Sequence, residues 1–175
     1  SETSGASPAG NITITTPLLT IDNESTLETS TRGMGDAGDI ILNADILNML
    51  RGARVLAATD GNGNGGTITV NAPTAVYLGL GVQDFAPILS VETSDAGKAG
   101  DIIINTPNFT LSETARITAT ATDTATNLDG GGSITLNADQ MNLAGVVGIF
   151  AETEGQAPGG ILTLQPYQHH QTLDV

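Results

Sequence analysis

The stretch Gly65-Gly66-Thr67-Ile68-Thr69-Val70 is one of six copies of a single pattern, in which two small residues precede a short alternating segment. The other copies begin at Ala9, Ala37, Ala99, Gly131 and Gly159. The second small residue is glycine every time, and successive glycines are separated by 28, 28, 34, 32 and 28 residues. A nearly fixed period of this size is typical of a repeat protein, in which each repeat packs mainly on its neighbours.

The segment after each glycine has the pattern of a half-buried β-strand. The second residue after the glycine is Ile or Leu in all six copies, and the fourth is Ile, Leu or Val. The residue between them is Thr in four copies and Ile at positions 41 and 103. Because side chains along a strand alternate between its two faces, the apolar columns predict one buried face.

Two further strands follow in each repeat. In the second strand we expect two inward columns, which are Leu19, Leu47, Ala75, Phe109 and Met141, and then Ile21, Met49, Tyr77, Leu111 and Leu143. In the third strand we expect inward columns of Leu27, Val55, Leu89, Ile117 and Ile149, and then Thr29, Ala57, Val91, Ala119 and Ala151. The third-strand columns require a six-residue insertion in the third repeat.

Three short strands per repeat, with no helical periodicity between them, predict the fold. They indicate an all-β protein, a parallel β-helix of five to six coils with about 28 residues per coil. We expect residues 1–166 to form a single β-helix domain and residues 167–175 to form a tail or cap. Thr3 shares a column with Thr31 and Thr59, so we expect the domain to be a fragment of a longer solenoid.

One column at the corner after the first strand is polar. It holds Asn43, Asn71, Asn105 and Asn137, with Thr15 in the first coil and Gln165 in the last. Asn tolerates turn conformations, and stacked amides can hydrogen-bond from one layer to the next. We interpret this column as a structural ladder rather than as a row of ligand-binding residues.

The composition excludes several classes of partner. The formal net charge is −14 with only five Lys and Arg, whereas binding to nucleic acid or to an anionic membrane requires a basic surface. The chain has no Cys, which excludes disulfides and thiolate metal sites. No stretch approaches the length of apolar sequence that spans a bilayer. We therefore expect neither a nucleic-acid partner nor membrane insertion.

We expect no cofactor and no metal site. Calcium is the alternative left open, because carboxylates suit Ca²⁺ and four of them, Asp36, Asp39, Asp60 and Asp129, lie near coil junctions. Asp beside Gly or Asn is explained first by turn formation. The Ca²⁺-binding nonapeptide repeat is not matched, and the adjacent histidines near the C-terminus lack an evident third ligand.

The two places where the period fails are candidate binding loops. Insertions in solenoids form loops on one face, which is often the binding face. The insertion at 79–87 carries the apolar residues Leu80, Val82 and Phe85, which we predict as the candidate partner contact, with packing onto their own coil as the alternative. The second insertion, at 122–129, is polar.

The repeats resemble those of a known family. The phrases at 37–44 (Ala-Gly-Asp-Ile-Ile-Leu-Asn-Ala) and 65–72 (Gly-Gly-Thr-Ile-Thr-Val-Asn-Ala), with Glu-Thr-Ser between coils, resemble the repeats of filamentous-haemagglutinin-like exoproteins, particularly those of cyanobacteria. The resemblance implies a right-handed β-helix secreted across the outer membrane by a two-partner system. It also implies the role of an adhesin or matrix component.

These observations predict a non-enzymatic, secreted β-helix at the outer cell surface, a stalk or attachment segment whose partner is a protein or glycan on a cell surface. One alternative is a self-assembling filament subunit that stacks end to end. The other is a polysaccharide-acting β-helix enzyme, for which Arg54 and Arg116 share a column but lack an obvious acidic cluster. An ice-binding face is not expected, because the outward columns of the third strand hold no continuous row of threonines.

Overall fold

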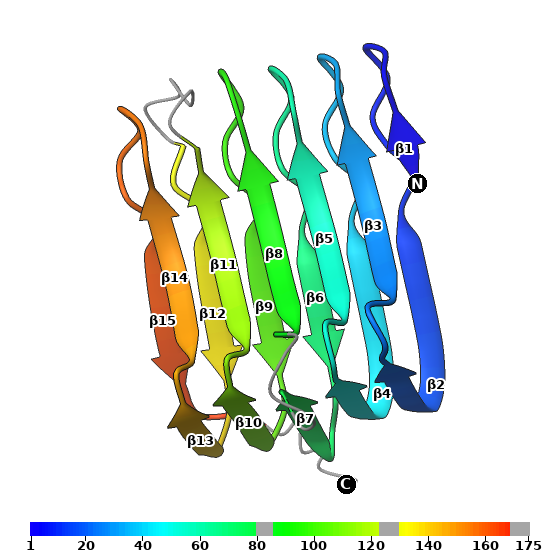
Figure 1. Ribbon diagram of the computed structural model, residues 1–175, viewed down its shortest axis with the longest axis vertical. Coiled ribbons are helices and arrows are strands. Elements are labelled where there is room, and N and C mark those ends of the chain that lie inside the picture. Colours follow the sequence, from blue (N-terminus) through cyan, green and yellow to red (C-terminus); the bar gives the residue numbers. More distant parts are fainter. Residues whose placement is uncertain (80–85, 123–129, 169–175) are drawn as a thin grey trace, which may run out of the picture.

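The coils stack side by side along one axis, as the computed structural model shows for residues 1–79, 86–122 and 130–168 (Figure 1). The protein is an all-β parallel β-solenoid of about 5 turns, with about 29 residues per turn. Every strand pairs in parallel with the equivalent strand of a neighbouring coil. The parallel β-helix predicted from the repeats is therefore confirmed.

The third strands of the coils form a sheet of their own. Its order is β1-β3-β5-β8-β11-β14, which follows the chain from one end of the solenoid to the other. Its strands are β1 (Glu2–Thr3), β3 (Thr26–Thr31), β5 (Arg54–Thr59), β8 (Ile88–Thr93), β11 (Arg116–Ala121) and β14 (Gly148–Thr153).

The first and second strands belong to one nine-stranded sheet that bends at the corner. In the first two coils, β2 (Ile12–Ile21) and β4 (Ile40–Met49) run through this corner without a break. In later coils the first strands are separate and comprise β6 (Ile68–Asn71), β9 (Asp101–Asn105), β12 (Ser133–Asn137) and β15 (Ile161–Gln165). The separate second strands are β7 (Ala75–Leu78), β10 (Asn108–Glu113) and β13 (Gln140–Gly145).

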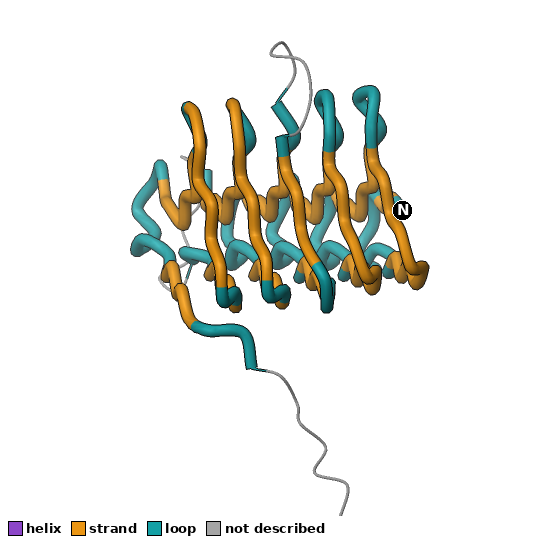
Figure 2. Tube along the Cα trace, turned by 90° about the horizontal axis from the view of Figure 1, so that it is seen from below, coloured by secondary structure: helices purple, strands orange, loops and turns teal. Residues whose placement is uncertain are grey.

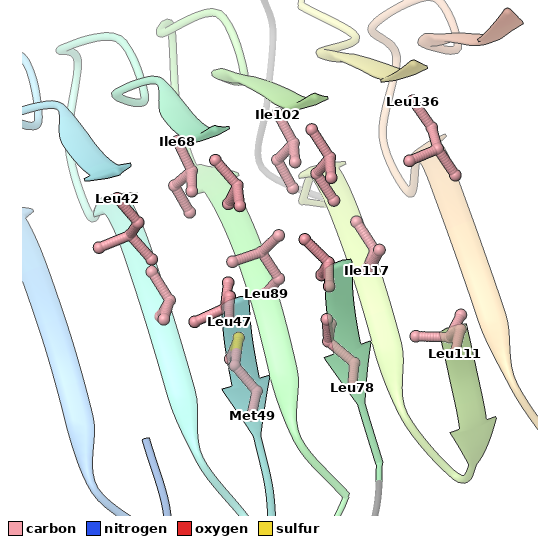
Figure 3. Packing of buried hydrophobic residues seen from close by; sticks show 14 of the residues in the cluster. Leu42, Leu47, Met49, Ile68, Leu78, Leu89, Ile102, Leu111, Ile117 and Leu136 are labelled. Carbon is pink, nitrogen blue, oxygen red and sulfur yellow. The ribbon is translucent and has the colours of Figure 1, made fainter. Parts of the chain in front are cut away.

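The three faces enclose a narrow apolar core (Figure 3). Leu42, Ile68 and Ile102 come from the first face, Leu78 from the second and Leu89 from the third. All five side chains are fully buried. The registers of the first and third strands agree with the predicted columns, since Ile68 pairs with Ile102 and Leu89 pairs with Ile117.

The predicted second-strand column is wrong in the third coil. Leu47 pairs with Val76, and Met49 pairs with Leu78. Val76 and Leu78 therefore occupy the inward positions that were predicted for Ala75 and Tyr77. Val76 is buried completely, whereas Tyr77 is only half-buried.

The physical reason is one extra residue at the corner of the third coil. Asn71 pairs with Asn43, at a separation of 28 residues, whereas Ala75 pairs with Ile46, at 29. A one-residue shift moves every side chain of a strand to the opposite face. The six-residue insertion is thus divided between the corner and the segment before β8, where Ile88 pairs with Arg54.

The repeated glycine is required by the close approach of neighbouring coils. A Cβ atom built on Gly100 would lie 1.9 Å from the carbonyl oxygen of Gly66, and one on Gly66 would lie 2.1 Å from that of Gly38. Both distances are far shorter than a van der Waals contact, and the backbone atoms involved cannot move freely. The glycine column therefore allows the turns before the first strands to stack.

Threonines from two columns of the third face hydrogen-bond the same turns. The buried hydroxyl of Thr29 donates to the carbonyl of Gly38 at 2.6 Å, and that of Thr31 donates to Gly35 at 2.6 Å. Thr59 repeats the contact with the carbonyl of Asn64 at 2.8 Å. Since Thr3 pairs with Thr31, the column of Thr31 and Thr59 extends to the first described strand.

Candidate binding surfaces: the amide ladder and the open end

The polar column at the corner forms an unbroken series of side-chain hydrogen bonds. Asn71 Nδ2 donates to Asn43 Oδ1 at 2.9 Å, Asn105 to Asn71 at 2.8 Å, and Asn137 to Asn105 at 2.5 Å. At one end Asn43 Nδ2 lies 3.5 Å from the hydroxyl of Thr15, and at the other Gln165 Nε2 donates to Asn137 at 2.7 Å. We call this series, from Thr15 to Gln165, the amide ladder.

The amide ladder lines two hollows on the outside of the corner. One has a volume of about 430 Å³ and is lined by Asn43 and Asn71 together with Thr15, Thr16, Pro17, Ala44, Asp45 and Pro73. The other has about 400 Å³ and is lined by Asn105, Asn137, Gln165, Pro166, Tyr167 and Gln168. Because Asn105 is hydrogen-bonded to Asn71, the ladder connects the two hollows. We call the two hollows with the ladder between them the ladder groove.

One sequence feature, the outward Asn column with prolines close behind it, could have indicated this groove. Asn alternates with buried residues, so its side chain faces outward, and prolines follow two places later at 17, 73 and 107. The hollows themselves are evident only in the folded structure.

The carboxylates near the coil junctions bind backbone groups of the next coil. Asp36 Oδ1 accepts a hydrogen bond from the amide of Asn64 at 2.7 Å, and Asp39 Oδ1 accepts one from Thr67 at 2.9 Å. Asp101 Oδ1 accepts both the amide and the hydroxyl of Ser133. In the described part of the chain, no group of three or more His, Cys, Asp or Glu residues is placed to hold a metal ion. Asp129 lies outside the described residues.

Two acidic groups have shifted pKa values. Arg51 donates to Asp22 through Nε at 2.8 Å, and this pair lowers the pKa of the half-buried Asp22 carboxyl. On the outside of β8, partial desolvation by neighbouring atoms raises the pKa of the Glu92 carboxyl, although the side chain remains exposed. The negative charges of Asp60 and Glu154 add to this rise, and Arg54 opposes it.

The cations considered for catalysis lie in one column of the third face. Arg54 and Arg116 both pair with Ile88, one on each side of it, and both are exposed. Their neighbours in the same column are Thr26 and Gly148. The column therefore brings the two cations to one face without a carboxylate between them.

The last coil leaves apolar side chains open to solvent. Met141, Leu143, Leu162 and Leu164 occupy inward columns, yet they are exposed. The strands β13, β14 and β15 each have one described neighbour, so their outer edges are unpaired within the described residues. We call this surface the open end.

The predicted tail begins beside the ladder groove. The amide of Tyr167 donates to Asp139 Oδ1 at 3.1 Å, which ties the start of the tail to the coil below. Residues 169–175, including both histidines, lie outside the described residues. The same holds for the candidate partner contact at Leu80, Val82 and Phe85 and for positions 123–129.

Comparison with known proteins adds no relative. No protein-family model, curated protein or solved structure matches this chain. None of the described residues form a helix that is long and apolar enough to span a membrane.

Proposed function

We propose that this protein is a non-enzymatic structural segment of a secreted protein at the outer cell surface, serving as a stalk or as a surface or matrix attachment segment. The observation that supports it most is how the polar side chains are used. Asn and Asp side chains bind the next coil at sequence separations of 28 to 34 residues, which reinforces the stack along its axis. A stack of similar coils is suited to spanning distance.

Charge and sequence support an extracellular location. A net charge of −14 keeps an extended β-protein soluble and repels like copies. The repeat phrases at 37–44 and 65–72 resemble filamentous-haemagglutinin-like exoproteins, and we include in the proposal secretion by their two-partner route and an origin in cyanobacteria.

Two measurements test the structural role. Size-exclusion chromatography with light scattering and small-angle X-ray scattering should show a short, monomeric rod. Antibodies raised against the purified chain should label intact cells of the source organism. Labelling that appears only after the cells are permeabilised would contradict the extracellular location.

A second candidate function, a filament subunit, is favoured by the open end. The inward columns of the last coil are exposed, and the edges of β13, β14 and β15 are free to pair with another strand. At the opposite end, β2 likewise has β4 as its one described partner. Stacking one copy on the next would be a head-to-tail contact that continues the ladders, and such contacts generate filaments.

Electron microscopy separates the two functions. A filament should lengthen as salt screens the negative charge, and Leu143→Glu should abolish it by placing a charge in the contact. The matched control is Thr110→Glu, on the outer side of β10, which should leave assembly unchanged. Monomers at every salt concentration would eliminate the filament. Cleavage of an acidic polysaccharide, lost on replacing Arg54 or Arg116, would instead support the enzyme alternative.

A further inference from the structure

The ladder groove combines concavity, repeated amide groups and apolar rings on one side of the solenoid. We propose that it binds a linear, uncharged polysaccharide whose chain runs along the solenoid axis. The proposal deepens the attachment role proposed above by naming the ligand class and the site. Ligand sites are generally concave and carry a few placed polar groups among apolar ones, as this groove does.

The amides retain hydrogen-bonding capacity after the ladder has formed. Each amide nitrogen carries two hydrogens and each amide oxygen has two lone pairs. The ladder uses one hydrogen of Asn71, Asn105 and Asn137 and one lone pair of the acceptor in the coil before. The second hydrogen and lone pair of each amide recur once per coil, at a spacing of about 4.8 Å.

A sugar chain matches such a row because every ring carries several hydroxyls that both donate and accept. An extended peptide matches it less well, since its groups on one side repeat only every second residue, about 6.6 to 6.8 Å apart. The peptide's main chain is also satisfied best by a free sheet edge, and the ladder groove offers side-chain amides instead.

Apolar rings line both hollows of the ladder groove, pyrrolidine rings in one and an aromatic ring in the other. Pro17 and Pro73 line the first hollow, and Tyr167 lines the second. The C–H face of a sugar ring packs on such surfaces, and an aromatic ring with a polar tip suits a surface that is both apolar and wet. The rings would hold the chain against the amides.

Charge restricts the ligand to an uncharged one. The residues that line the two hollows include the carboxylate of Asp45 and no Lys or Arg. With a net charge of −14, the whole molecule repels polyanions. Uronate and sulfate polymers are therefore excluded as ligands of this surface.

The test uses the full chain and four hexasaccharides. Cellohexaose, xylohexaose and laminarihexaose are the uncharged probes, and hexagalacturonate is the charged one. Nuclear magnetic resonance of the Asn and Gln side-chain amides should show saturable shifts with at least one uncharged probe, confined to the ladder groove, and none with hexagalacturonate. The expected affinity is weak, because the two hollows are shallow and open.

Two tyrosines provide matched variants that leave the ladder intact. Tyr167→Ala should weaken binding about fivefold, as expected for the loss of one ring contact. Tyr77→Ala removes a half-buried tyrosine from the second face, outside the groove, and should leave the affinity unchanged. Pro73→Ala tests the first hollow in the same way.

Several results would overturn the glycan site. They are the absence of saturable shifts with all three uncharged probes, equal effects of the two tyrosine variants, and saturable shifts with hexagalacturonate. A negative result would leave the rod and the surface labelling unaffected, so the failure of this site and the failure of the structural role are distinguishable.

Discussion

The middle coils and the last coil carry the same columns of residues but differ in what covers them. Leu111 in β10 and Leu143 in β13 are paired in register, yet Leu111 is 0% exposed and Leu143 is 52% exposed. Leu111 has a coil on each side, whereas Leu143 has a described coil on one side only. The comparison teaches that burial in a solenoid is supplied by neighbouring coils rather than by the repeat itself.

Glycine substitutions should give the largest difference in unfolding free energy between a middle coil and the last coil. Gly100→Ala places a methyl group against the Gly66 carbonyl, so we expect a loss of about 3 kcal/mol or more in unfolding free energy, measured in urea. The matched control is Gly159→Ala, where a Cβ meets nothing within 4 Å. An equal loss in both variants would show that backbone entropy, and not the close approach of coils, requires glycine.

Leucine truncation measures the contribution of the covering coil directly. Leu111→Ala should lower the unfolding free energy by about 2 to 5 kcal/mol, because it leaves a cavity in the packed core. Leu143→Ala should lower it by less than about 1 kcal/mol, because the side chain is already half in water. If Leu143→Ala proved equally costly, the open end would be covered in solution.

In the amide ladder too, a substitution in a middle coil should cost more unfolding free energy than one in the last coil, although both losses should be smaller. Asn105→Ala removes one bond to Asn71 and one from Asn137, and we expect a loss of about 1 to 2 kcal/mol in chemical denaturation. Gln165→Ala removes one exposed bond and should cost about 0.5 kcal/mol. Losses of similar size would indicate that the bonds in the middle gain nothing from their place in a series.

The smallest effect concerns Glu92, whose pKa is raised above its ordinary value of 4.5. The native state holds this proton more tightly than the unfolded state, so its stability falls as pH rises through 4.5 and the carboxylate forms. Because the Glu92 side chain is exposed and solvent screens its charge, Glu92→Gln should stabilise the protein by less than about 0.5 kcal/mol at neutral pH, and not below the ordinary pKa. Thermal unfolding at several pH values measures the effect.

Glu152→Gln is the control for this pH effect, because Glu152 occupies the same column in the last coil. Its strand has a described neighbour on one side only, and the substitution should change stability little at any pH. A gain from Glu92→Gln that persisted in acid would contradict an electrostatic origin.

Most of the fold could be predicted because the repeat presents the same constraint many times. The columns of Ile68 and Leu89, the ladder position of Asn71 and the pairing of Thr3 with Thr31 all follow from one alignment. The failure at Ala75 and Tyr77 has an equally specific cause. Residues 75–78 are all apolar, so both registers satisfy the pattern, and the extra corner residue is visible only in the pairing.

The candidate binding sites were harder to predict from the sequence than the fold was. Leu80, Val82 and Phe85 were chosen where the period fails, and their role as a partner contact stays a prediction, as does the right-handed sense implied by the family resemblance. The ladder groove lies where the period holds, on residues explained by stacking. Its proposed second role depends on the two hollows, which no single column of residues predicts.

The sequence by itself determined the period, the three strands per coil, the position of the repeated glycine and the polar corner column, because each is a pattern repeated along the chain. The tertiary structure alone decided the register at the corner of the third coil, the hollows beside the ladder and the exposure of the last coil. Figure 2 shows the stack of coils, with the last coil at the end opposite the N-terminus. These features depend on which surfaces meet in space. A column of identical leucines therefore contains a buried core residue at one coil and an exposed apolar surface at the next.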